Sequence, residues 1–187
     1  MMITIHRLVR RLGRDQRGNF LVELAFAMPL VAGLLLTGVE FTRYMLINQK
    51  LERTSATIAD LVSQSQGMSE AEMASLFNAT DMIMEPFNLD ADGSLVVSSI
   101  SATGSAPARI NWQRARGGGS GGSEFGTEGN PAELPTGLVV RDGESLIAAE
   151  AFYDYEPLIF QSILESKTLY RWAVFRPRFS ALTEINP

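Results

Sequence analysis

Acidic residues near the end of a strand-like segment are the first candidates for chemistry in this chain. Glu150, Asp154 and Glu156 lie close together in the sequence AEAFYDYEPL. Because strand side chains alternate, Glu150 and Asp154 fall on one face. Two neighbouring carboxylates could act as general acid and base or hold a metal. Acids at strand ends are usually only solvated, so we expect neither a catalytic residue nor a metal site here.

A glycine-rich stretch, residues 116–136, also matches two catalytic motifs in form. The run GGSGG at 118–122 fits a nucleophile elbow, which needs a histidine partner. The chain's one histidine, His6, lies near the N-terminus. The same glycines fit a dinucleotide fingerprint, but no βαβ pattern follows them. We interpret the stretch as a native, low-complexity and mobile loop, although it resembles an engineered linker.

The sequence NLDADG, residues 88–93, resembles the start of a calcium-binding loop. The twelfth position of such a loop needs a bidentate glutamate, and here it is Ser99. A predicted strand also begins at once, at Ser94. A tight turn into a strand is the better interpretation, so we expect no calcium.

Composition narrows the class of protein further. The chain has 187 residues, 45% of them hydrophobic, with 16 Lys and Arg against 21 Asp and Glu. The length suits one domain with an appendage. A net charge of −5 argues against nucleic-acid binding. The absence of cysteine excludes disulfides, thiolate metal sites and thiol nucleophiles. We expect no cofactor and no small-molecule substrate.

The N-terminal third predicts a membrane span. Residues 1–18 contain several arginines and one acid, and residues 20–39 follow with Glu23 as their one charge. Twenty helical residues cover about 30 Å, the thickness of the hydrocarbon core of a bilayer. The positive-inside rule places residues 1–18 in the cytoplasm and the rest outside. A buried helix of a soluble core is the less favoured alternative.

A cleaved secretory signal is a second alternative, but the apolar run is long and lacks a small-x-small cleavage site at its far end. The helical pattern instead continues to about Ser65. Its apolar stripe recurs at three- and four-residue steps and consists of Tyr44, Ile47, Leu51, Thr54, Ile58 and Leu61. We predict one helix from Phe20 to Ser65, spanning the membrane to about residue 39 and amphipathic beyond it.

Glu23 is costly in such a span unless it is paired or neutralised. It could be an interfacial residue that reaches toward lipid headgroups. Alternatively, Gly18 ends a cleaved leader and Asn19 becomes a new N-terminus. The free amine of a neighbouring subunit would then pair with Glu23 and fix the register of the helices.

A basic leader, Gly18, the sequence NFLVE and an apolar helix resemble type IV prepilins and pseudopilins. Over residues 14–62 the chain resembles more closely the TadE-like family of minor pseudopilins from tight-adherence (Flp-type) pilus systems, through Gly18, Glu23, Pro29 and the VEF sequence at 39–41. The resemblance implies that a prepilin peptidase cuts between Gly18 and Asn19. The major Flp pilin often has Glu-Tyr after its cleavage site, whereas this chain has Glu23-Leu24 and a large C-terminal domain.

Four residues, Ala25, Pro29, Gly33 and Thr37, fall on one four-residue row of the helix. Small side chains on one face let membrane helices approach closely, although such a row also arises by chance in an Ala/Gly/Leu-rich span. Pro29 lacks an N–H and predicts a kink or local melting.

Residues 66–187 predict a small α+β domain. Ser69 and Glu72 form a capping-box signature before a helix that extends to about Met82. Strands are predicted at 94–101, 109–113, 138–141, 146–155 and 170–176, with a hairpin turn at 141–144. We expect an antiparallel sheet packed on the stripe of the long helix, which is the pilin-like architecture that the resemblance implies.

The faces of the 146–155 strand can be assigned from its alternation. One carries Ile147, Ala149, Ala151 and Tyr153, and the other carries Glu150, Phe152 and Asp154. We expect Trp112 and Trp172 in the core or on a sheet face. Tyr153, Tyr155 and Phe160 fit either the core or an exposed patch for subunit contact.

The favoured function is that of a minor pseudopilin, a structural and not an enzymatic role. The implied partners are prepilin peptidase, other pilins and pseudopilins, the pilus assembly platform and the membrane. The expected location is the bacterial inner membrane, with the C-terminal domain in the periplasm, or the pilus itself. The alternative is an uncleaved, signal-anchored receptor whose outer domain binds a ligand.

Overall fold

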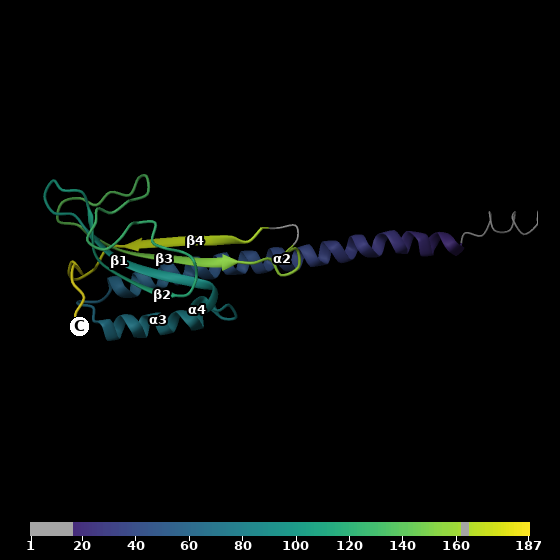
Figure 1. The fold of residues 1–187 in the computed structure, drawn as a ribbon, viewed down its shortest axis with the longest axis horizontal. Helices are drawn as coiled ribbons and strands as arrows, with labels where there is room; N and C mark the ends of the chain where they lie inside the picture. The colour runs from purple at the N-terminus through teal and green to yellow at the C-terminus, as the bar shows by residue number, and fades with distance from the viewer. Residues whose placement is uncertain (1–16, 162–164) are drawn as a thin grey trace, which may run out of the picture. The chain divides into compact units, whose positions relative to one another are not determined.

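The computed structural model describes residues 17–161 and 165–187, with side chains from residue 20 onward. The chain divides into two units between Thr42 and Arg43. Helix α2 (Arg17–Ser63) is the long helix of Figure 1. The boundary falls within it, so that each unit contains one part of this helix. The predicted leader lies outside the described residues, except for the backbone of Arg17 and Gly18.

Helix α2 confirms the predicted long helix and ends two residues earlier than expected. Pro29 lies inside it, and the helix is continuous on both sides of this residue; the predicted kink or local melting stays a prediction. Thr37 and Thr42 each donate a 2.8 Å hydrogen bond to the carbonyl four residues earlier. Their hydroxyl groups are therefore satisfied within the helix.

The sheet has four antiparallel strands in the order β2-β1-β3-β4, which confirms the predicted α+β class. The strands are β1 (Gly93–Ser101), β2 (Arg109–Gly117), β3 (Ser145–Tyr155) and β4 (Lys167–Phe175). Strands β1 and β3 are central, and a register shift lies between Ser99 and Ile100 of β1.

The predicted strand at 138–141 is wrong. The turn at 141–144 would pair this strand with β3, but both edges of β3 are already paired, with β1 and with β4, so none is left for residues 138–141. Leu138 and Val140 pack against a second hydrophobic cluster as part of a loop. The turn at 141–144 does form, with the Glu144 amide donating to the Arg141 carbonyl at 2.9 Å and Gly143 at a φ of 75°. It leads from this loop into β3 instead of joining two strands.

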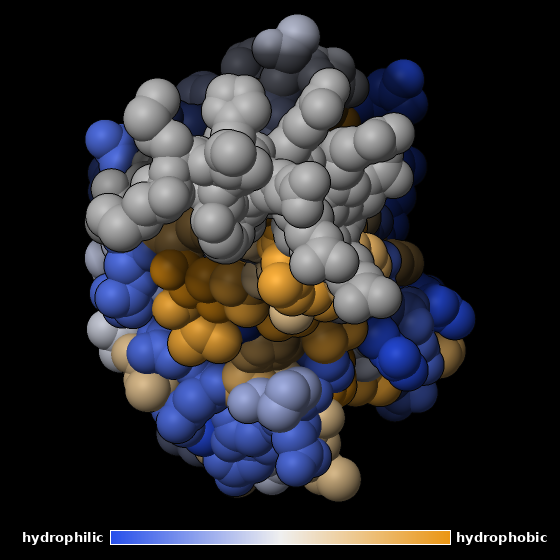
Figure 2. Space-filling model, turned by 90° about the vertical axis from the view of Figure 1, so that its right-hand side faces the viewer, coloured by the Kyte–Doolittle hydropathy of each residue, from blue (hydrophilic) through white to orange (hydrophobic). Residues whose placement is uncertain are grey.

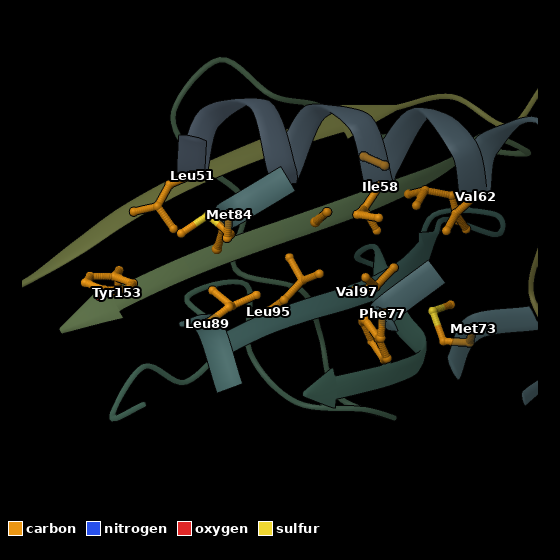
Figure 3. Packing of buried hydrophobic residues seen from close by; sticks show 14 of the residues in the cluster. Leu51, Ile58, Val62, Met73, Phe77, Met84, Leu89, Leu95, Val97 and Tyr153 are labelled. Atoms are coloured by element: carbon orange, nitrogen blue, oxygen red, sulfur yellow. The ribbon is translucent and has the colours of Figure 1, made fainter. Parts of the chain in front are cut away.

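The main core lies between the second part of α2 and one face of the sheet. Ile47, Leu51, Ile58 and Val62 of α2 are fully buried with residues of β1 and β3 (Figure 3). The predicted stripe is confirmed except at its end. There Val62, four residues after Ile58, is buried in place of Leu61, which is 41% exposed. The β3 residues that were predicted to share one face all belong to this core, namely Ile147, Ala149, Ala151 and Tyr153.

Helix α3 (Glu70–Met84) begins with the predicted capping box between Ser69 and Glu72. It buries Met73, Phe77 and Met84 in the same core as α2. The sequence read as a turn at 88–93 forms a one-turn helix, α4 (Leu89–Asp92), before β1. Asp90 of α4 is paired with Arg116 of β2, and no group of acids that could hold a metal occurs among the described residues.

Two leucines of α2 allow a matched test of this packing. Leu51→Ala should lower the free energy of unfolding by about 2–5 kcal/mol, because Leu51 is fully buried in the main core. Leu61→Ala, at a 41% exposed position of the same helix, should cost about 1 kcal/mol or less. Urea unfolding of the full chain in detergent measures both, and equal losses would contradict the packing described.

Candidate functional site

The first part of α2 exposes a continuous hydrophobic surface. Phe26, Leu30 and Leu34 are 76%, 70% and 68% exposed, and most large side chains between Phe20 and Val39 resemble them. Figure 2 views the molecule from the right-hand side of Figure 1 and shows hydrophobic surface, in orange, on that face. In the described part of the chain, one helix is long and apolar enough to cross a membrane, and this apolar stretch is not buried. It is consistent with a single membrane span or signal anchor.

Glu23 is exposed within this hydrophobic surface. Among the described residues it has no hydrogen-bond or ion-pair partner. It follows Asn19 by four residues, which is about one helical turn or 6 Å along the axis. The backbone of Gly18 and Asn19 is helical, and the side chain of Asn19 lies outside the description. Any charge that neutralises Glu23 must therefore come from the undescribed residues or from another molecule.

The row of Ala25, Pro29, Gly33 and Thr37 lies in the exposed part of α2. A Cβ atom built on Gly33 would meet no atom within 4 Å. The Thr37 hydroxyl donates to the Gly33 carbonyl, so its polar group is already used. This face therefore carries small side chains, and its one hydroxyl group is already hydrogen-bonded within the helix. Both features suit close approach of a second helix.

The two predicted strand carboxylates do share a face of the sheet, but each is saturated by different donors. Glu150 is fully buried and accepts hydrogen bonds from the Glu124 amide at 2.8 Å, the Tyr170 hydroxyl at 3.0 Å and the Ser123 hydroxyl. This burial contradicts the expectation of a merely solvated acid.

Asp154 is held in the same way at another point of the loop. It accepts from the Ser120 amide at 2.8 Å and from the hydroxyls of Ser120 and Thr168, each at 2.7 Å. Glu156 is exposed beyond the strand. Glu150 and Asp154 therefore fasten the glycine-rich loop to the sheet, each with its own set of donors.

The glycine-rich loop is packed, which corrects the prediction of a mobile segment. Phe125 is 1% exposed, and its ring meets the ring of Trp172 edge-on at 5.8 Å. A Cβ atom on Gly121 would lie 2.2 Å from the Phe152 ring. Glycine is thus required here for close approach and not for flexibility. Strand β2 also takes up Arg116 and Gly117, the first residues of the predicted loop.

The protonation of this site follows from its burial. Burial raises the pKa of Glu150 above its ordinary value, although the donors from Ser123, Glu124 and Tyr170 oppose this rise. Burial and the neighbouring Glu150 raise the pKa of Tyr170. Burial also acts to raise the pKa of Asp154, but its hydrogen bonds from Ser120 and Thr168 outweigh this and lower it.

Most of the aromatic residues for which both a core position and a surface position were considered belong to the core. Tyr153 and Tyr155 are 3% and 5% exposed, which excludes an exposed patch at these two positions. Trp112 is buried, and its Nε1 donates to the Leu182 carbonyl at 2.8 Å. Trp172 lies on the sheet face and is 40% exposed.

Comparison with family models, with curated proteins and with solved structures finds no match for this chain. The arrangement of its elements is nevertheless pilin-like. A long N-terminal apolar helix continues into a part that packs on a four-stranded antiparallel sheet.

The pH dependence of stability tests the buried carboxyl. The folded-state pKa of Glu150 is raised above its ordinary value of 4.5, so the folded protein holds this proton more tightly than the unfolded chain. The stabilisation from the protonated group is complete below about pH 4.5 and is lost as the pH rises through the raised pKa. We expect the free energy of unfolding of the wild type, relative to Glu150→Gln, to fall across that window.

Urea unfolding at a series of pH values measures this difference. Glu156→Gln, an exposed acid just beyond the same strand, controls for the loss of one charge. A relative free energy that stays constant or rises with pH would show that Glu150 is not held as described.

Proposed function

We propose that this chain is a minor pseudopilin of a tight-adherence (Flp-type) type IV pilus system. The observation that carries the proposal is the division of α2. Its second part is buried on the chain's own sheet, and its first part exposes side chains that water solvates poorly. A pseudopilin uses such an exposed apolar helix in two settings, in the membrane before assembly and against neighbouring helices afterwards.

Processing supplies the charge that Glu23 lacks in this proposal. Prepilin peptidase would hydrolyse the peptide bond between Gly18 and Asn19, which leaves a carboxylate on Gly18 and an α-ammonium group on Asn19. The ammonium group of one subunit would pair with Glu23 of its neighbour. A charge pair in an apolar environment is permitted at one register only, so it aligns the subunits along the assembly.

The row of Ala25, Gly33 and Thr37 supports close packing of these helices in the assembled state. The folded unit from Arg43 to Pro187 supports a minor component, since it is large for a major pilin of this class. The saturated carboxylates on the sheet support a structural role in place of catalysis. We place the protein in the bacterial inner membrane, with residues 1–18 cytoplasmic before cleavage and the sheet domain periplasmic.

N-terminal sequencing of the full chain, expressed with and without a prepilin peptidase, tests the processing step. With the peptidase we expect a terminus at Asn19. Gly18→Leu should abolish cleavage, because the bulky side chain replaces the residue on which the peptidase acts. Gly33→Leu, at a glycine of the same helix with open space around it, should be cut normally.

A Met1 terminus in the presence of the peptidase would contradict the proposal and favour the signal-anchored receptor. Cleavage beyond Val39 would instead indicate an ordinary secretory signal. Normal processing of Gly18→Leu would also count against the assignment.

Glu23→Gln tests the register step separately. Cleavage should be unchanged, while incorporation into the sheared pilus or pseudopilus fraction should fall at least about tenfold, since breaking a buried pair costs about 3–5 kcal/mol. Glu52→Gln, at an exposed glutamate later in α2, is the matched control and should assemble normally. Immunoblots of the membrane and sheared fractions measure both, and normal assembly of Glu23→Gln would remove the role given to this residue.

A further inference from the structure

The segment that follows β3, residues 156–161, exposes a large apolar side chain beside α2. Leu158 is 63% exposed, and Ile159 and Phe160 are half-buried. One exposed leucine has no meaning by itself. Its significance comes from where the segment is held.

Arg43 and Tyr44 of α2 hold the start of this segment. The guanidinium Nη1 of Arg43 donates to the Glu156 carbonyl at 2.7 Å. The same guanidinium lies 5.4 Å from the centre of the Tyr155 ring, and the Tyr44 ring meets that ring edge-on at 5.4 Å. The start of the segment, two residues before Leu158, is thus fixed at the level of residues 43 and 44 of the helix.

This level has a particular meaning if the first part of α2 spans the membrane. Arg43 follows Val39, the end of the apolar run, by about one helical turn or 6 Å. Residues one turn beyond a span lie among the lipid headgroups, where tryptophan and tyrosine are enriched. Met45, at the same level of α2, is 41% exposed. An exposed leucine at this depth meets the boundary between headgroups and acyl chains.

We propose that residues 156–161 form a membrane-interface anchor that places Leu158 in the outer surface of the lipid bilayer. The proposal rests on the membrane span assigned under the proposed function. The anchor would give the subunit a second point of contact with lipid and fix the depth at which α2 sits before assembly. Extraction of the subunit into a pilus would then have to release this contact as well as the span.

The sheet domain offers a control residue that is as exposed as Leu158 but lies near the other end of α2. Phe179 is 64% exposed. Its neighbours bind the far end of α2 and the residues just after it. The Arg178 amide donates to the Ser63 carbonyl at 2.9 Å, and the Ser180 hydroxyl donates to the Gln66 carbonyl at 2.8 Å. Residue 63 lies about 30 Å along the helix from residue 43. A general tendency of exposed apolar residues to touch lipid would affect Phe179 as well, whereas an anchor affects Leu158.

Because the chain has no cysteine, a single polarity-sensitive fluorophore can be attached at Leu158→Cys, Phe179→Cys or Leu34→Cys. The full chain is reconstituted in vesicles of phosphatidylethanolamine and phosphatidylglycerol that contain lipids with a nitroxide at a shallow or a deep position. We expect a blue shift and quenching by the shallow nitroxide at position 158, and quenching by the deep nitroxide at position 34. The label at position 179 should resemble one in water.

Two different results would overturn the anchor and can be told apart. If the label at position 34 is quenched while those at 158 and 179 are equally exposed to water, the anchor is wrong and the span stands. If the label at position 34 is not quenched, the span fails, and the anchor and the proposed function fail with it.

Discussion

Helix α2 is apolar along most of its length, but the described chain buries only the second part of it. The rest of the structure depends on this difference between the two parts. From Ile47 to Val62 the apolar stripe is buried on the sheet, and between Phe20 and Val39 most large side chains are more than half exposed. Burial of one large apolar side chain contributes about 1.5–3 kcal/mol. Covering the exposed part of α2 would therefore contribute a large favourable free energy. Under the proposed function, a membrane span that later packs in a helical bundle covers this part, as the sheet covers the second part.

The sheet domain solves a different problem, which is how to cover its second face without another helix. Helices α2 and α3 bury one face, and the glycine-rich loop lies on the other, held by Glu150 and Asp154 and by the buried ring of Phe125. Both carboxylates accept hydrogen bonds from residues of the loop. The two acidic residues therefore contribute to the folding of the domain.

Local signals made some features predictable from the sequence, and others depended on distant partners. The long apolar helix, its stripe and the Ser69 capping box rest on residues within a few turns of one another, and the structure has all three. The packing of the loop could not be predicted, because a glycine-rich, low-complexity sequence indicates flexibility. Only the structure shows that Gly121 lies against Phe152. Nor could the burial of Glu150 be predicted, because its donors Ser123 and Tyr170 come from other segments. Of the candidate site, Gly18 and Glu23 could be named from the sequence pattern, and their roles in processing and register stay predictions.

The most direct test of the account is the reaction of single cysteines along α2 with a membrane-impermeant maleimide, in intact cells whose outer membrane has been made permeable. Leu30→Cys and Gln49→Cys are both at exposed positions of the helix. The account predicts that Gln49→Cys is labelled from the periplasmic side and that Leu30→Cys is labelled only after the membrane is dissolved in detergent. Equal labelling of the two positions in intact membranes would show that water reaches the apolar part of α2, and would contradict the central claim.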